Sequence, residues 1–209
     1  MTTRKKTSRK AESRRICKVK TVVIGGTFNP VHIGHLYLAE EVRTQGGYER
    51  VIFVPSHIPA HKNPDYCTSP QHRLEMLSRA VKESDYIVVD DCEMRRGGIS
   101  YTYDTILDLQ QRYNIEGAPG LVIGDDLVEG LPKWKLWEEL HEMVDLIIAH
   151  RLYTDKVPCS WPHTYIDNLV LPISSSAIRS RVEEGCVFRY LVPDEVYHYI
   201  LTNGLYRGC

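Results

Sequence analysis

Two histidines, His32 and His35, stand three residues apart, directly after the run Gly25-Gly26-Thr27-Phe28-Asn29-Pro30-Val31. This segment follows an apolar β-branched stretch and precedes a helical pattern, so we predict that it joins a buried strand to a helix. In an open α/β sheet that junction is where ligands bind. Gly25 and Gly26 let a phosphate approach the backbone, and the helix start offers N–H groups and a positive dipole end. We therefore predict a site where both imidazoles donate to phosphate oxygens.

A second polar run, Ser174-Ser175-Ser176, precedes another helical pattern, with Arg179 one turn further on. Serine hydroxyls before a helix commonly cap it. A run of this kind is usually no more than a cap when it stands alone. Arginine adds a forked, permanently charged donor for phosphate oxygens. With Arg179 in phase, and about 140 residues after the histidines, we interpret the run as a second phosphate cradle.

A third candidate segment, Gly124-Asp125, follows the apolar run 121–123 and is predicted at the same edge of the sheet. Asp125 could accept hydrogen bonds from a ribose or orient a Mg²⁺ ion. Trp134, a few residues later, offers a flat face for stacking, whereas we assign Trp137 to the core. We predict no metal site made by the protein, because zinc at the two histidines would need further ligands at short spacing.

The elements that must position these residues are predicted from periodicity. Continuous apolar runs are typical of strands buried on both faces of a parallel sheet, and they occur at 19–24, 51–54, 86–89, 121–123 and 146–149. Helical patterns lie between them at 35–45, 70–83, 103–113 and 136–143. This alternation predicts an α/β protein with a doubly wound, mostly parallel, Rossmann-like sheet.

The remaining elements are two C-terminal helices and a long loop. One helix is predicted from Ser175 towards Glu184, and the other follows Pro193 and ends near Asn203. The segment 55–70 contains four prolines and is predicted as a loop, and loops of that length are often functional.

The charge distribution and the cysteine content indicate the cellular environment of the protein and the extent of its folded domain. The net charge is −1, but residues 1–20 hold nine Lys or Arg against the single acid Glu12. Such a segment cannot pack a core, so we predict a disordered basic arm over 1–18 and a single domain over 19–209. Six scattered cysteines without a C-x-x-C pair indicate reduced thiols. With no signal peptide or apolar span visible, we expect a cytoplasmic protein with no membrane partner.

The motifs also carry a family resemblance over roughly residues 20–207. The run 25–35 resembles the G-G-T-F-x-P-x-H-x-G-H signature of the nucleotidyltransferase superfamily, and 173–179 resembles its I-S-S-T-x-I-R element. More specific segments resemble the bacterial nicotinate-nucleotide adenylyltransferases: Ile123–Trp137, Pro55–Lys62, His72–Leu77, Ser100–Thr105 and Gly204-Leu205-Tyr206.

The resemblance implies transfer of the adenylyl group of ATP to nicotinate mononucleotide, giving deamido-NAD and pyrophosphate, with Mg²⁺ accompanying ATP. It implies that catalysis falls to His32, His35, Arg179 and Lys62. ATP would be bound by Gly25, Gly26, Thr27, Phe28, Gly124, Asp125, Ser174, Ser175 and Ser176. Nicotinate would be recognised by Thr102, Trp134 and the backbone N–H of Lys135. Asp104 and Thr105, in the same element as Thr102, are interpreted as helix-capping residues.

One position departs from the family, and some alternatives stay open. Many relatives carry Asp where this chain has Asn29, so we do not expect a general base or metal ligand there. Rival interpretations are another adenylyltransferase, such as a pantetheine-phosphate adenylyltransferase, and a non-enzymatic nucleotide- or RNA-binding protein that uses the basic arm. Nucleic-acid binding is not our expectation. The sequence leaves the oligomeric state open, and a homo-oligomer is compatible with it.

Overall fold

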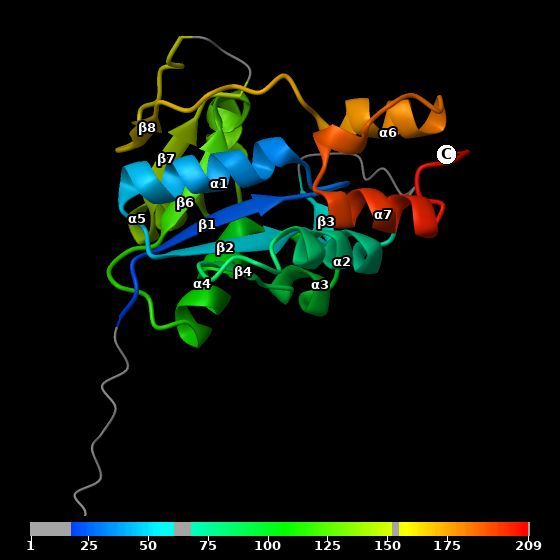
Figure 1. The fold of residues 1–209 in the computed structure, drawn as a ribbon. Helices are drawn as coiled ribbons and strands as arrows, with labels where there is room; N and C mark the ends of the chain where they lie inside the picture. Colours follow the sequence, from blue (N-terminus) through cyan, green and yellow to red (C-terminus); the bar gives the residue numbers. More distant parts are fainter. Residues whose placement is uncertain (1–17, 61–67, 152–154, 209) are drawn as a thin grey trace, which may run out of the picture.

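The computed structural model describes residues 18–60, 68–151 and 155–208. Six parallel strands form the central sheet in the order β4-β2-β1-β6-β7-β8 (Figure 1). Their bounds are β1 Thr21–Gly26, β2 Arg50–Pro55, β4 Ile87–Val89, β6 Gly120–Gly124, β7 Asp145–Ala149 and β8 Thr164–Ile166. The strand order runs outward in both directions from β1 and β6, so the switch point, where open sheets bind ligands, lies between these two strands.

Helices cover both faces of the sheet. The longer ones are α1 (Ile33–Gly46), α2 (Pro70–Ala80), α4 (Thr102–Arg112), α5 (Trp137–Met143), α6 (Ser175–Glu183) and α7 (Asp194–Thr202). One core cluster joins β1 and β2 side chains to α1, α2, α6 and α7. The other joins the opposite face of these strands to α4 and α5. Residues alternate between the two clusters along β1, as Val22 and Val23 do, because successive side chains in a strand point to opposite faces.

The predicted fold class is confirmed, and each predicted strand and helix is present with shifted ends. Helix α2 begins as predicted, with the Ser69 hydroxyl accepting from the His72 N–H and Pro70 in the first turn. It ends at Ala80 rather than Glu83. Helix α1 begins at Ile33, two residues before the predicted start, so His32 becomes its N-cap.

Several short elements were not predicted. They are β3 (Ile58–Pro59), α3 (Cys92–Arg96), β5 (Ile99–Ser100), the 3₁₀ helices η1 (Asp125–Lys133) and η2 (Arg189–Leu191), and strand β8. Strands β3 and β5 pair in parallel as a separate small sheet. The predicted loop 55–70 therefore contains a strand, which is too short to show a hydrophobic period.

The basic arm lies outside the described residues, apart from Lys18. Within the described part, Cys92, Cys159 and Cys186 are free thiols. No helix of that part is both long enough and apolar enough to cross a membrane.

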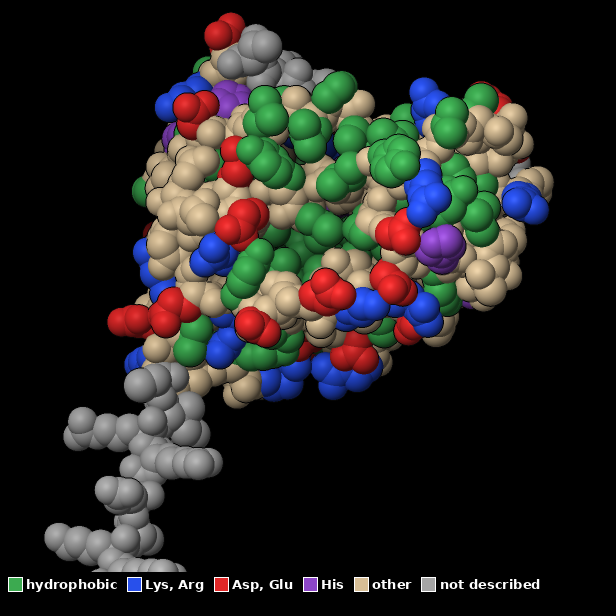
Figure 2. Space-filling view, viewed as in Figure 1, with side chains coloured by type: hydrophobic (Ala, Val, Ile, Leu, Met, Phe, Trp, Pro, Cys, Tyr) green, Lys and Arg blue, Asp and Glu red, His purple; other side chains and the backbone are tan. Residues whose placement is uncertain are grey.

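The surface of the molecule, viewed from the side drawn in Figure 1, is hollowed at its upper edge (Figure 2). The hollow lies between the part that carries β7 and β8 and the part that carries α6 and α7.

Candidate active site

The first motif forms the junction between β1 and α1. His32 is the N-cap of α1, and His35 is its third residue. The backbone N–H of His32 donates to Nδ1 of His35 at 3.1 Å. Because Nδ1 of His35 accepts this bond, the neutral ring carries its proton on Nε2, which makes that atom a donor. The two ring centroids are 3.7 Å apart, so the predicted pairing of the imidazoles is present.

The glycine between the histidines has a steric role. A Cβ atom at Gly34 would lie 3.1 Å from Nδ1 and 3.2 Å from Cε1 of His32. A side chain at this position would therefore displace the His32 ring. That ring is buried, and its Nδ1 has no hydrogen-bond partner among the described residues.

The protonation state of His32 follows from its surroundings. Burial, and next the positive charge of Arg151, lower the pKa of His32 to about 4. The imidazole is therefore neutral near pH 7 and can donate through one ring nitrogen only. Arg151 follows β7 and was not among the residues selected from the sequence, because a single arginine in a polar loop gives no motif.

The remaining residues of the first motif divide between surface and core. Gly25 is exposed, and a Cβ atom there would meet nothing within 4 Å. At Gly26 a Cβ atom would lie 2.9 Å from the Phe28 ring, so the missing side chain makes room for that ring. Phe28 is 2% exposed, and its ring packs edge-on against His35 and Phe53. The prediction that Phe28 contacts ATP is therefore wrong for its side chain, which instead supports His35. Thr27 is half-buried, with its carbonyl accepting a hydrogen bond from Arg73.

Arg73 of α2 ties the loop after β1 to the loop after β2. Its guanidinium donates to the carbonyl oxygens of Thr27, Ser56 and His57, at 2.8, 2.7 and 3.0 Å. The side chain is buried, which lowers the pKa of Arg73. These three hydrogen bonds are all with backbone carbonyl groups, so Arg73 fixes the positions of the two loops.

The second motif lies against the first. Ser175 Oγ donates to the Pro30 carbonyl at 2.8 Å, and the Arg179 guanidinium donates to the Asn29 carbonyl at 2.9 Å. Ser174 caps α6 by accepting from the Ala177 N–H at 3.1 Å. The α6 N-terminus thus lies beside the loop that joins β1 to α1 (residues 27–32, hereafter the histidine loop), although the two segments are far apart in sequence. Arg179 also approaches Ser176 Oγ, at 3.4 Å.

The third segment is less open than predicted. The Asp125 side chain is fully buried, with His150 Nδ1 3.7 Å from its Oδ2. A ribose could not reach this carboxylate in the present conformation. A Cβ atom at Gly124 would lie 2.3 Å from Asp126 Oδ1, so a side chain there would displace the Asp126 carboxylate. Asp126 in turn binds Arg151 at 3.0 Å.

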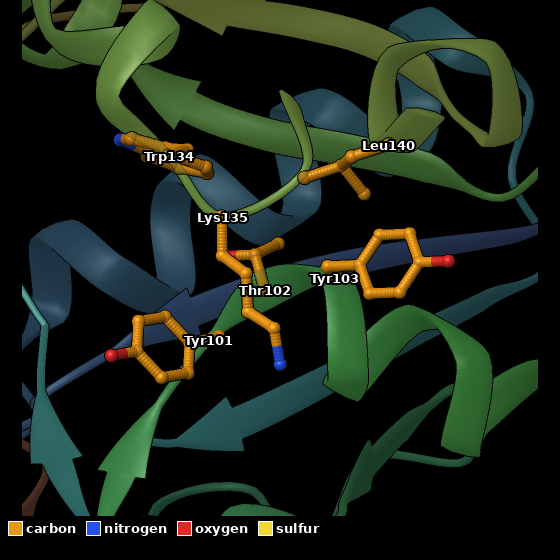
Figure 3. Close-up of a pocket in the computed structure, with 6 residues that line it drawn as sticks. All are labelled: Tyr101, Thr102, Tyr103, Trp134, Lys135 and Leu140. Carbon is orange, nitrogen blue, oxygen red and sulfur yellow. The ribbon is translucent and has the colours of Figure 1, made fainter. Parts of the chain in front are cut away.

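The residues selected for nicotinate do converge on one pocket. Thr102, Trp134 and Lys135 line it together with Tyr101, Tyr103 and Leu140, as Figure 3 shows. Thr102 is the first residue of α4, and Trp134 follows η1. Trp134 is half-buried at this pocket, whereas Trp137 is 3% exposed, which confirms its assignment to the core.

The interpretation of Asp104 and Thr105 as capping residues is wrong. Helix α4 has Tyr101 as its N-cap, with no side-chain capping bond. Asp104 instead binds the Lys135 ammonium, with its Oδ2 at 2.7 Å. Thr105 is buried and donates to Glu93 at 2.6 Å. Both side chains bind residues of other elements, and the local sequence spacing does not indicate such partners.

Lys62 lies outside the described residues, but the strand that leads towards it is described. Strands β3 and β5 pair Ile58 with Ile99 and Pro59 with Ser100. The His57 N–H also donates to Ser100 Oγ at 2.9 Å. The segment preceding Lys62 therefore runs beside the segment that leads into Thr102.

The described residues offer little to hold a metal ion by themselves. No group of three or more His, Cys, Asp or Glu side chains in the described ranges could bind one. Imidazoles such as His32 and His35 are poor ligands for Mg²⁺, which prefers oxygen.

Comparisons with known proteins agree with this arrangement. The profile of a family described as cytidylyltransferase-like matches residues 23–181. A protein of Borreliella burgdorferi named as a probable nicotinate-nucleotide adenylyltransferase is 42% identical over 188 residues, covering 90% of this chain and 97% of that protein. A protein of Treponema pallidum with the same name is 36% identical over 204 residues, covering 91% of this chain and 100% of that protein.

A solved structure shares the fold. It is the nicotinic acid mononucleotide adenylyltransferase of Plasmodium falciparum in complex with NaAD. The TM-score is 0.68 at 22% identity, and the match covers 90% of this chain and 97% of that one. At this identity the likeness concerns the arrangement of helices and strands.

Proposed function

This chain belongs to the cytidylyltransferase-like family and, within it, to the nicotinate-nucleotide adenylyltransferases, and on that premise we propose that it transfers the adenylyl group of ATP to nicotinate mononucleotide. The products are deamido-NAD and pyrophosphate, and the reaction belongs to NAD biosynthesis. The resemblance found in the sequence is thereby confirmed. The relatives' names count against a pantetheine-phosphate adenylyltransferase and a non-enzymatic role.

One observation carries this proposal: the two segments that we assign to phosphate binding and a pocket with aromatic lining lie along the ligand side of one sheet. The histidine loop leaves β1, and the α6 N-terminus is hydrogen-bonded to that loop through Ser175 and Arg179. The pocket of Thr102 and Trp134 lies between α4 and the end of η1. Such a layout suits one ligand rich in phosphates and another that carries an aromatic ring.

The chemistry needs no protein nucleophile. An oxygen of the substrate's 5′-phosphate attacks the α-phosphorus of ATP, and the bond from that phosphorus to the oxygen bridging to the β-phosphate breaks. Pyrophosphate leaves with the bonding electrons. Catalysis of this kind rests on positioning and on charge stabilisation. We assign donation to phosphate oxygens to His32 and His35, the latter through Nε2, and charge compensation to Arg179 and Lys62.

The remaining ATP contacts are assigned by exposure. Gly25, Ser174 and Ser176 are exposed and Thr27 and Ser175 are half-buried, and we assign their backbone or hydroxyl groups to ATP. Gly26, Phe28, Gly124 and Asp125 contribute backbone or support, since their side chains are missing or buried. Thr102, the Trp134 ring and the Lys135 N–H are assigned to the nicotinate group.

Nucleotidyltransferases of this kind generally use a divalent metal ion together with ATP. We propose that the ion is Mg²⁺ and that it enters with ATP, held mainly by phosphate oxygens and water. It would neutralise phosphate charge there.

The proposal is tested by incubating the full chain with ATP, Mg²⁺ and nicotinate mononucleotide. Deamido-NAD and pyrophosphate should form in equal amounts, as measured by chromatography and a coupled pyrophosphate assay. Pantetheine phosphate serves as the control acceptor and should give no product. If no adenylylated product appears with nicotinate mononucleotide, or if pantetheine phosphate is the better acceptor, the proposal is wrong.

A further inference from the structure

The side chain of Lys135 occupies the pocket that we assign to the nicotinate ring. Figure 3 shows it extending across the pocket past Thr102, and its ammonium lies 5.1 Å from the centre of the Tyr101 ring. The cavity that remains is about 10 Å³, which is room for a single water molecule. A pyridine ring therefore cannot enter while Lys135 keeps this position.

Asp104 holds Lys135 in place. The ammonium lies 2.9 Å from Oδ1 and 2.7 Å from Oδ2, so one carboxylate binds it with both oxygens. The two side chains come from different elements, the first turn of α4 and the turn after η1. The exposed fractions are 39% for Lys135 and 30% for Asp104, so the pair is open enough to exchange partners.

The Lys135 ammonium and the N-terminus of α4 would both attract the carboxylate of a bound substrate. Asp104 stands in the first turn of α4, where the helix dipole stabilises negative charge. Thr102 is the first residue of that helix, so its N–H belongs to the positive end of the helix dipole. A substrate carboxylate at Thr102 would therefore meet both the helix N-terminus and the Lys135 ammonium, and it would compete with Asp104 for both.

We propose that Asp104 and Lys135 form a latch on the nicotinate pocket, which opens when the substrate's carboxylate replaces Asp104 as the partner of Lys135. This inference rests on the proposed function. An acid substrate restores the counter-charge that Lys135 loses on opening, whereas an amide does not. Lys135 thus determines specificity through its side chain, in addition to its backbone N–H, and Asp104 is a positioning residue that acts through Lys135.

The test compares nicotinate mononucleotide with nicotinamide mononucleotide in variants of the full chain. Lys135→Met keeps the length of the side chain and removes its charge. The ratio of kcat/KM for the acid to that for the amide should fall about three- to tenfold, as suits a partly exposed charge contact. Lys135→Arg should keep the ratio.

Asp104→Asn supplies the opposite change. It removes the competitor for Lys135 and a like charge beside the substrate, so KM for the acid should fall and the acid-to-amide ratio should rise. Lys133→Met is the matched control, because Lys133 is an exposed lysine two residues from Lys135 that does not line the pocket. Its ratio should equal that of the wild type. Melting temperatures check that every variant is folded.

Two results would overturn the latch: an unchanged ratio in Lys135→Met, or a higher KM for the acid in Asp104→Asn. Titration of tryptophan fluorescence with each mononucleotide measures the same preference without turnover. If the wild type binds the acid in preference to the amide through Lys135 but forms no product, the latch stands and the proposed function fails. If product forms and the preference for the acid over the amide does not depend on Lys135, the proposed function stands and the latch fails.

Discussion

The hydroxyl of Tyr206 donates to the side-chain oxygen of Asn29 at 2.8 Å, across 177 residues of sequence. Both side chains are buried. The same Asn29 holds Arg179 through its backbone carbonyl. The end of the chain is therefore part of the support for the loop between β1 and α1, and it engages the side-chain oxygen of Asn29 inside the protein.

Tyr206→Phe should lower both stability and turnover. Removing the hydroxyl leaves the buried Asn29 oxygen without this donor, which typically costs about 1–3 kcal/mol. We expect a loss of that size in urea unfolding, and a fall in kcat larger than any change in KM for ATP, because the loop carrying His32 loosens. Tyr190→Phe is the control, since Tyr190 is 82% exposed. Equal kcat in wild type and Tyr206→Phe would show that the contact stabilises the fold alone.

His35→Ala should abolish most adenylyl transfer and leave the fold intact. The variant removes an imidazole whose Nε2 proton is fixed in place by the bond at Nδ1. Loss of a preorganised donor of this type lowers the rate about 10²–10³-fold. Steady-state kinetics give the rate, and circular dichroism checks the fold. The control is His198→Ala, an exposed histidine of α7. Turnover near that of the wild type would remove His35 from phosphate binding.

Stability should rise with pH over the range set by His32. Its pKa is lowered from 6.5 to about 4 in the folded state, so the unfolded chain binds more protons between these values. The free energy of unfolding therefore increases as pH rises from about 4 to 6.5 and falls on acidification. The full change attributable to His32 is on the order of 3 kcal/mol. Urea titrations of wild type and His32→Gln across this range should differ in slope, and parallel curves would contradict the assignment.

The two tryptophans should respond differently to truncation. Trp134→Ala removes a half-buried ring at the pocket and should raise KM for the acid and amide mononucleotides alike, because stacking does not distinguish them. Trp137→Ala removes a ring that is 3% exposed and packs against Trp161. It should destabilise the protein by about 3–5 kcal/mol. Kinetics and thermal unfolding separate the two effects. Normal KM values in Trp134→Ala would show that Trp134 serves packing and does not contact the substrate.

Deletion of residues 1–18 should leave activity and stability nearly unchanged. The arm is strongly basic and has no apolar face to pack. The first tertiary contact on its C-terminal side is the bond from the Val19 N–H to the Asn114 carbonyl, at 3.1 Å, which the deletion keeps. Melting temperature and kcat/KM measure the outcome. A large drop in either would make the arm part of the domain or its site.

The sequence by itself determined the fold class and supplied most of the residues that we propose for the site. Buried parallel strands are continuous apolar runs, so five of the six strands of the sheet were readable in the sequence, whereas the short edge strand β8 was not. Phosphate-binding loops use short contiguous motifs, because adjacent backbone N–H groups and side chains serve one ligand. His32, His35, Ser175 and Arg179 were therefore found before any geometry was known, and so was the group of Thr102, Trp134 and Lys135.

Tertiary structure alone decided which partners these residues have. The sequence does not show that Asp104 binds Lys135, that Tyr206 binds Asn29 or that Arg151 lowers the pKa of His32. Each of these contacts joins side chains that folding brings together from distant segments, and a lone charged residue carries no local pattern. The burial of Phe28 and Asp125 has the same origin: exposure depends on the elements packed above a residue, which its own neighbours in sequence do not specify.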